Sequence, residues 1–295
     1  MADITVRRIR FSFDEPIDLA VPDEVLGAML PILGLSMTMP YLEPYLIRTM
    51  KAAQQEIRDE ALGEDARRFS QQEGHHYRNH AAFNEGIRAA FGESTQRELR
   101  ALEATLDADY QRYTRERSLR FNLAYAEGFE AMTCALALAM AEHGVFREPA
   151  VPGGEIWPWH MAEEIEHRTV AFQVYEHVVG SYPYRVLAGG FAQAHYAGFI
   201  RRFARCMARG LGRRPRRAVS AVGRSALRRY LRTWSPWYDP ARIEVPAGVQ
   251  ELLDRYGRLA EQSAGRVHPA GGATWVQAEG AQRDAGERSR SGGTR

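Results

Sequence analysis

The residues best suited to chemistry in this chain are glutamates and histidines that recur at one spacing. The runs Glu73–His76 and Glu164–His167 each contain Glu-x-x-His. Residues three positions apart on an α-helix project from the same side, so each run would present a carboxylate and an imidazole together. Carboxylate oxygens and imidazole nitrogens are ligands for first-row transition metals. Two such runs on separate helices predict a metal centre.

Single glutamates on two other helical segments complete a ligand set for two ions. Glu127 lies in the apolar stretch Phe121–Phe129, where an unpaired carboxylate is unfavourable. Glu43 lies near the start of an earlier segment. Single glutamates from two helices of a bundle and Glu-x-x-His from two others are the ligands of a dinuclear carboxylate centre. The predicted metal ligands are Glu43, Glu73, His76, Glu127, Glu164 and His167.

The spacing also suggests how these ligands divide between the ions. One ion would take Glu43, Glu73 and His76, and the other would take Glu127, Glu164 and His167. Glu73 and Glu164 are the predicted bridging pair, because bridging carboxylates offset the repulsion between two cations. Iron is the expected metal, although manganese and zinc suit the same ligands.

Two further histidines share the faces of the motifs. His80 follows His76 by one turn, and His160 precedes Glu164 by one turn. Each is either an additional ligand or a nearby catalytic group that moves protons. Glu130 and Glu163 are the weaker alternatives to the predicted carboxylate ligands.

The pattern of apolar residues, prolines and glycines predicts an all-α protein. We expect an irregular segment over residues 1–40, a metal-binding helical domain with basic C-terminal helices over 41–262, and a disordered tail over 263–295. The expected helices cover Tyr41–Leu62, Glu64–Phe91, Ser94–Gly144 with a break near Ser118, Ile156–Val179, Tyr184–Leu211, Arg217–Thr233 and Ala247–Gln262.

The composition is that of an ordinary globular protein, with 45% hydrophobic and 26% charged residues and a net charge of +2. Two cysteines give no disulfide framework and no zinc pattern. The polar, basic start does not resemble a secretory signal, and the apolar run Ala131–Ala141 is too short to cross a bilayer. We therefore expect a cytoplasmic protein.

Positive charge is concentrated late in the chain. The run Arg201–Arg232 holds twelve arginines and no acidic residue. A solvated helical face is the simplest interpretation. An acidic partner such as a carrier protein and an anionic membrane surface are the alternatives, the latter favoured by nearby aromatic residues. Nucleic acid is disfavoured, since no recognition motif accompanies the charge.

The motif regions resemble a family of bacterial proteins described as predicted metal-dependent hydrolases. The run Phe69–His80 is similar to that family's QE-x-x-H-x-x-x-H block, and Trp157–Phe172 is similar to its second block. Pro40–Glu43 is similar to its Pro-x-Gly-Glu, with leucine in place of glycine. The resemblance covers residues 5 to 260. The ligand pattern also resembles the ferritin-like di-iron superfamily, which implies a four-helix bundle and reactions with O₂.

Three functions follow from these patterns. The first is a di-iron oxygenase or oxidase that uses O₂ on a small organic substrate. The second is a hydrolase that uses a metal-bound hydroxide, with His80 or His160 as general base. The third is a metal-storing or structural bundle. The sequence favours the first and does not specify the substrate or the oligomeric state.

Overall fold

The computed structural model describes residues 4–13, 16–145, 154–214 and 221–263, and these residues form helices without any β-strand. This confirms the all-α prediction. The helices are α1 (Asp23–Ala53), α2 (Glu60–Ala89), α3 (Glu93–Glu116), α4 (Leu119–Glu142), α5 (Ile156–Glu166), α6 (Val170–Val178), α7 (Tyr182–Gly210), α8 (Ala221–Thr233), the 3-10 helix η1 (Pro240–Arg242) and α9 (Ala247–Ser263).

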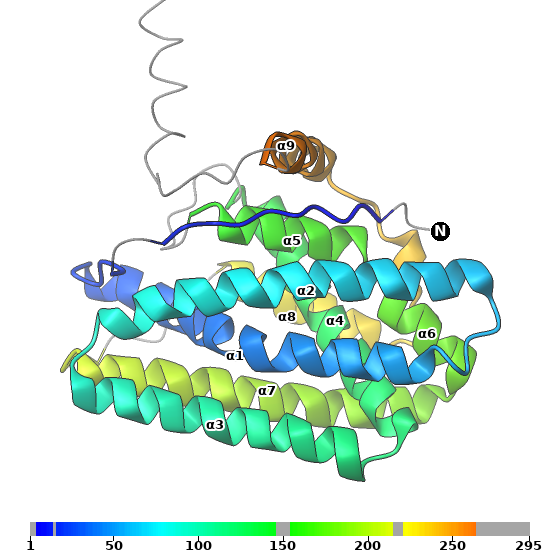
Figure 1. Cartoon of the computed structure of the whole chain (residues 1–295), viewed down its shortest axis with the longest axis horizontal. Helices are drawn as coiled ribbons and strands as arrows, with labels where there is room; N and C mark the ends of the chain where they lie inside the picture. The colour runs from blue at the N-terminus through cyan, green and yellow to red at the C-terminus, as the bar shows by residue number, and fades with distance from the viewer. Residues whose placement is uncertain (1–3, 14–15, 146–153, 215–220, 264–295) are drawn as a thin grey trace, which may run out of the picture.

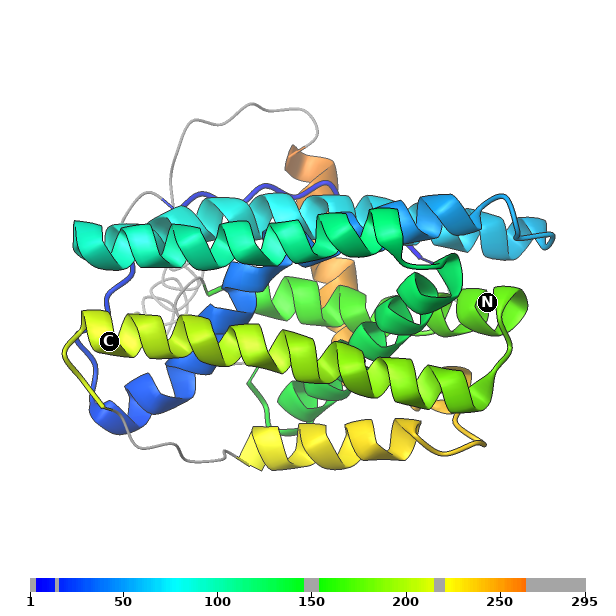
Figure 2. The same cartoon turned by 90° about the horizontal axis from the view of Figure 1, so that it is seen from below.

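The helices that carry the motifs pack around one core. α1 contacts α2, α3, α4 and α7, and α4 contacts α5, α6, α7 and α8. Figure 1 shows α2 lying along α1, with α5 beyond it and α9 above α5. Figure 2 shows α1 running obliquely past the long, nearly parallel α3 and α7. Glutamates and histidines on α1, α2, α4 and α5 can therefore meet in the middle.

Helix α1 begins at Asp23, earlier than the predicted start at Tyr41, and contains three prolines. A proline in a helix has no N–H to donate to the carbonyl four residues before it. Pro40 thus leaves the carbonyl of Ser36 without its helical donor, and Asn84 of α2 donates to that oxygen at 3.0 Å. Intrinsic helix propensity predicts that the helix ends at these prolines. α1 continues through them because its contacts with neighbouring helices bury it on several sides.

The predicted break near Ser118 is confirmed. Helix α3 ends at Glu116, and the hydroxyl of Ser118 accepts a hydrogen bond from the backbone N–H of Phe121 as the N-cap of α4. The helix predicted over Ile156–Val179, by contrast, is two helices. The N–H of Val170 bonds to the carbonyl of His167, and this tight turn separates α5 from α6.

Two close contacts set the positions of the motif helices. A Cβ added to Gly128 of α4 would lie 2.6 Å from the Cα of Gly189 on α7, so these helices touch through their backbones. The extended residues 4–13 run across α2 and α5 below α9 (Figure 1). Within that segment, the guanidinium of Arg7 contacts carboxylates of Glu163 and Glu166 at 3.2 and 2.8 Å.

The arginine-rich run is divided between α7 and α8. Among the described residues of this run, Arg209 of α7 pairs with Glu98, Arg213 just after α7 pairs with Asp23, and Arg229 of α8 pairs with Glu142. Arg216 and Arg217 lie outside the described residues. Of the tail predicted to be disordered over 263–295, Ser263 is the last residue of α9, and residues 264–295 lie outside the described residues.

Two helices, α1 and α4, are long and apolar enough to cross a membrane by length and composition alone. However, 61% of the relevant window in α1 and 89% of that in α4 are buried inside the protein. Core helices pass the same test, so this finding is weak evidence for a membrane span. The cytoplasmic location stays a prediction.

Candidate metal centre

Glutamates and histidines from α1, α2, α4 and the α5–α6 turn meet in the core. Glu43, Glu73, His76, His160 and Glu164 are fully buried, and His167 is 1% exposed. Their potential ligand atoms form two groups, and within each group all of these atoms lie within 4.8 Å of one another. The first group is Glu43, His76 and His160, and the second is Glu73, Glu164 and His167. Five of the six predicted ligands are thus brought together, with His160 joining them.

Glu164 and Glu73 occupy the middle of the cluster. The Oε1 of Glu164 lies 2.9 Å from His160 Nε2, 3.6 Å from His167 Nε2 and 4.0 Å from His76 Nδ1. The Oε1 of Glu73 lies 3.2 Å from His76 Nδ1 and 3.7 Å from His167 Nε2. Each carboxylate therefore reaches histidines of both groups, as bridging ligands would.

Glu127 is not in the cluster, contrary to the sequence prediction. Its carboxylate accepts a hydrogen bond from Arg185 of α7 at 2.9 Å. Burial raises the pKa of Glu127 to about 7 despite this cation. Glu130, one turn further along α4, is the residue that faces the motifs, with its Oε2 at 3.2 Å from His167 Nε2. The weaker alternative thus takes the place expected for Glu127.

The cluster concentrates negative charge in the core. Burial raises the pKa of Glu43 well above its usual value, and the nearby carboxylates of Glu73, Glu164 and Glu130 add to that shift. Burial and Glu164 raise the pKa of Glu130 to about 8, opposed by His167. Without a cation, these carboxylates cannot all ionise at neutral pH, which is the electrostatic condition that bound metal ions relieve.

Two histidines are oriented so that one ring nitrogen faces the cluster. His76 Nε2 lies 2.8 Å from a Glu163 oxygen, which can only accept when ionised, so this nitrogen donates and Nδ1 faces the carboxylates. Burial opposes the charged form of His76, but the Glu163 and Glu73 contacts raise its pKa to about 9. Glu163 therefore orients the ring of a candidate ligand and is itself held by Arg7.

His167 is oriented in the same way by Gln72. The amide nitrogen of Gln72 donates to the carbonyl of Thr5 and to Glu166, which leaves its oxygen 3.0 Å from His167 Nδ1. That nitrogen must donate, and Nε2 faces Glu130, Glu73 and Glu164. Gln72 thus orients His167, while the adjacent Glu73 is a candidate ligand; the sequence motif did not reveal this role of Gln72.

His80 is behind His160 and does not reach the carboxylates at ligand distance. Its Nε2 lies 2.7 Å from His160 Nδ1, and its Nδ1 lies 2.8 Å from the Ser36 hydroxyl. Burial and the neighbouring His160 and His76 lower the pKa of His80 well below its usual value. The structure therefore separates the two extra histidines, with His160 in the cluster and His80 one contact further out.

Many polar atoms of the cluster have no hydrogen-bond partner. Fifteen buried side-chain atoms are unpartnered among the described residues, and nine of them belong to this site. They are both carboxylate oxygens of Glu43, Glu73 and Glu130, one oxygen of Glu164, His76 Nδ1 and His167 Nε2. Buried polar groups are nearly always paired, so this concentration requires an explanation that bound cations supply.

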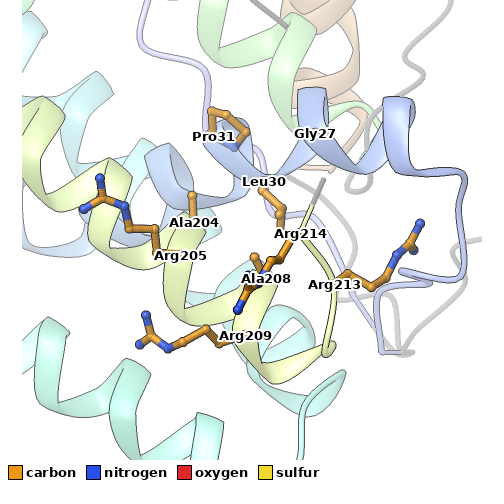
Figure 3. Close-up of a pocket in the computed structure, with 9 residues that line it drawn as sticks. All are labelled: Gly27, Leu30, Pro31, Ala204, Arg205, Ala208, Arg209, Arg213 and Arg214. Atoms are coloured by element: carbon orange, nitrogen blue, oxygen red, sulfur yellow. The ribbon is translucent and has the colours of Figure 1, made fainter. Parts of the chain in front are cut away.

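A separate pocket lies between α1 and α7, with a volume of about 290 Å³. Its walls include Arg205, Arg209, Arg213 and Arg214 over an apolar floor, and it includes no residue of the cluster. Figure 3 shows these guanidinium groups pointing in different directions. They do not converge on one point, so the pocket does not form a single anion site.

Comparisons with known proteins give one match. Residues 5–244 match the model of a family described as "Predicted metal-dependent hydrolase". No curated protein and no solved structure matches the chain, so the likeness to ferritin-like proteins stays a prediction. The match spans most of the chain and includes every residue of the cluster, so the chain belongs to the predicted metal-dependent hydrolase family.

Proposed function

We propose that this cluster binds two divalent metal ions and that the protein is a metal-dependent hydrolase acting on a small organic substrate. The observation that carries the proposal is the set of nine buried, unpartnered oxygen and nitrogen atoms that face one another. Unpaired polar atoms are costly in a core, and metal coordination removes that cost. The family description supports the hydrolytic reaction.

The charges of the site fit two divalent ions. Glu43, Glu73, Glu130 and Glu164 bring four negative charges when ionised, which two divalent cations neutralise. Glu163 does not enter this balance, because Arg7 and His76 already contact it. All donors are oxygen or nitrogen atoms, a set that suits iron, manganese and zinc.

When bound, such ions would polarise an ester, amide or phosphoester and lower the pKa of a water molecule. The side chains of the protein hold the ligands in place for that reaction. Glu163 and Gln72 fix the rings of His76 and His167 from behind. The rings of Trp159 and Phe69 pack edge-on against these same histidines at centroid distances of 4.8 Å and limit access of bulk water.

The first test is metal content. Elemental analysis of the purified protein, as isolated and after reloading, is expected to find two ions per chain. Glu73→Gln and Glu164→Gln should each reduce that number, whereas Glu64→Gln, which removes an exposed partner of Arg67 and Arg68, should not. Failure of the wild-type protein to retain any metal after reloading would refute the proposal.

The second test separates the reaction classes. Protein loaded with zinc or manganese is incubated without oxygen against panels of esters, amides and phosphoesters. Turnover that is lost in Glu164→Gln supports hydrolysis. Stoichiometric metal with no turnover in any panel or with oxygen would instead support the metal-storing or structural alternative.

An O₂-dependent oxidase is the second candidate, and the burial of the cluster favours it. The carboxylates and imidazoles are between 0% and 3% exposed, which suits a small apolar reactant better than bulk water. Oxygen consumption by the iron-loaded protein, absent in Glu164→Gln, would support this candidate. Such consumption, together with no hydrolysis under anaerobic conditions, would overturn the hydrolase proposal.

A further inference from the structure

We propose that His80 is a positioning residue that holds His160 with its Nε2 turned toward the metal centre, through a chain of hydrogen bonds that begins at Pro40. This inference rests on the proposed metal centre and adds a role for a histidine that the sequence assigned to catalysis. The direction of every hydrogen bond in the chain follows from the donors and acceptors available.

The chain starts where α1 lacks a backbone donor. Pro40 cannot donate to the Ser36 carbonyl, and the amide nitrogen of Asn84 does so instead. This contact fixes the orientation of the Asn84 amide, so its oxygen is the acceptor that faces the Ser36 hydroxyl. That hydroxyl donates to Asn84 Oδ1 at 2.6 Å.

The remaining steps pass from Ser36 to the cluster. Because the single hydroxyl hydrogen of Ser36 is directed at Asn84, its oxygen accepts from His80 Nδ1. A neutral imidazole with hydrogen on Nδ1 has its lone pair on Nε2, which then accepts from His160 Nδ1. His160 Nε2 is then left without a hydrogen and faces Glu164 and Glu43 at 2.9 and 3.6 Å. Two acceptor atoms at 2.9 Å repel one another, so this tautomer belongs to the metal-bound state, in which a cation would take the place of the proton that His160 and Glu164 share without metal.

Burial distinguishes positioning from proton transfer. Ser36, His80, Asn84 and His160 are all fully buried. Among the described residues, this series of hydrogen bonds therefore ends inside the protein at a backbone carbonyl and does not connect His80 to solvent. A general base must later release the proton that it takes up, and the described part of the chain gives the buried His80 no path for that release. The geometry therefore points to a role of His80 in orienting His160.

The experiment compares two substitutions of His80. Glutamine has one acceptor oxygen and one donor amide, and can accept from His160 while it donates to Ser36, but it cannot act as a base at neutral pH. Leucine is of similar size and can do neither. His75→Gln on the same helix is the control, because His75 is half-buried and outside the cluster.

We expect His80→Leu to weaken zinc or manganese binding by about 10- to 100-fold, the usual effect of losing an outer partner of a ligand. His80→Gln should retain affinity within about threefold of the wild type. Nitrogen NMR of the zinc-loaded wild type and His80→Gln should show His160 protonated at Nδ1. In His80→Leu that signature should be lost, with the fold monitored by circular dichroism.

Two results would overturn the inference. Wild-type affinity and an unchanged His160 signal in a folded His80→Leu would show that His80 does not position its neighbour. Loss of turnover in His80→Gln with full metal affinity would show that His80 is a catalytic base. Absence of metal binding in the wild type would instead refute the proposed metal centre, so the two failures are distinguishable.

A second inference comes from a different surface. We infer that α8 and the residues after it bind an anionic lipid bilayer. Leu227, Leu231 and Trp234 are 52%, 49% and 40% exposed, and Trp237 is 84% exposed. Leu227 and Leu231 lie one turn apart on one face of α8, and Trp234 directly follows the last residue of that helix, so exposed apolar side chains continue from α8 into the next segment.

Arginines form a row beside these apolar side chains. Arg224, Arg228 and Arg232 repeat at every fourth position of α8, and all three are exposed. The opposite side of α8, which includes Ala226 and Tyr230, is buried against the protein. A helix with no acidic residue that exposes both arginine and leucine or tryptophan suits the boundary between anionic headgroups and acyl chains.

Vesicle co-sedimentation tests this surface. Wild-type protein should bind phosphatidylcholine vesicles that contain phosphatidylserine, bind pure phosphatidylcholine weakly, and dissociate at high salt. The double variant Arg228→Ser/Arg232→Ser should lose affinity by roughly 30-fold, at about 1 kcal/mol for each arginine. Trp237→Ser should also weaken binding, whereas Leu187→Ser, an exposed position on α7, should not.

No difference between vesicle types, or equal binding by the double variant, would refute the membrane surface. Salt-sensitive binding to a purified acyl carrier protein, with no vesicle binding, would also refute it and would assign the arginines to an acidic partner.

Discussion

Exchange of Glu127 and Glu130 for glutamine, one at a time, provides the sharpest test of the metal centre. The two residues lie one turn apart on α4 and are equally buried, at 3% exposure each. Only Glu130 contacts the cluster, through His167, whereas Glu127 contacts Arg185. Glu130→Gln should therefore impair metal binding, and Glu127→Gln should not.

The structure sets the size of both effects. Removal of an outer partner of a ligand costs 10- to 100-fold in affinity, so loss of a direct ligand at Glu130 should cost at least about 100-fold. The metal-free Glu130→Gln protein should remain folded, because the raised pKa of about 8 means that Glu130 already carries a proton near neutral pH.

The stability of Glu127→Gln depends on the ionisation of the carboxyl group that it replaces. Burial, only partly offset by Arg185, raises the pKa of Glu127 from 4.5 to about 7, which corresponds to about 3 kcal/mol against the ionised form at pH 7. Glutamine cannot ionise and escapes this cost, which already includes the attraction of Arg185. The metal-free variant should therefore be more stable than the wild type at pH 7 by up to about 3 kcal/mol, or roughly 6–12 °C in Tm.

The assay is metal titration by calorimetry, with elemental analysis and thermal melting of each variant. Wild-type metal content in Glu130→Gln, together with loss of metal in a folded Glu127→Gln, would refute the assignment. The sequence-based choice of Glu127 as the ligand would then be correct.

Three further outcomes are expected. The pKa of Glu127 is higher in the folded than in the unfolded state, so its contribution to the free energy of unfolding is present below pH 4.5 and is lost as the pH rises through 7. Denaturant titrations of the metal-free protein should show the free energy of unfolding of the wild type falling by up to about 3 kcal/mol relative to Glu127→Gln over this range. An unchanged difference would contradict this. Gly128→Ala should destabilise by about 1–3 kcal/mol, because its Cβ would meet Gly189, whereas Gly190→Ala has open space and should stabilise by about 0.5–1 kcal/mol; equal unfolding midpoints for the two variants would refute the close contact. Metal at 1,000 times its Kd should add about 4 kcal/mol, so a chelator should lower Tm, and a Tm that does not fall after verified metal removal would contradict coordination in the core.

The helices were largely predictable because their signals are local. Ser118 before an apolar run is a cap signal, and the break between α3 and α4 occurs there. The start of α1 was not predictable by the same rules, since Pro31, Pro40 and Pro44 each argue against a helix interior. Contacts with α2, α3, α4 and α7 stabilise α1 as a helix, and these contacts cannot be predicted from the helix propensities of its residues.

The same division applies to the site. Glu73 with His76, and Glu164 with His167, were identified because each pair needs only the geometry of one helical turn. The outer partners Glu163, Gln72 and His80 each contact a histidine from another segment, at separations of 80 to 95 residues. Their roles depend on helix packing, and no spacing along one helix specifies them.

The sequence by itself determined the chemistry, namely carboxylates and imidazoles on helices that suit two metal ions. The tertiary structure decided which residues of α4 and α5 take part. Gly128 touches α7 at Gly189, and this contact sets how α4 is rotated about its axis. At about 100° per residue, Glu130 lies about 160° around the helix from Gly128 and faces away from α7, while Glu127 lies closer to it and meets Arg185. The rotation of a helix against its neighbour depends on packing. Only the tertiary structure could therefore decide whether Glu127 or Glu130, three residues apart, faces the cluster.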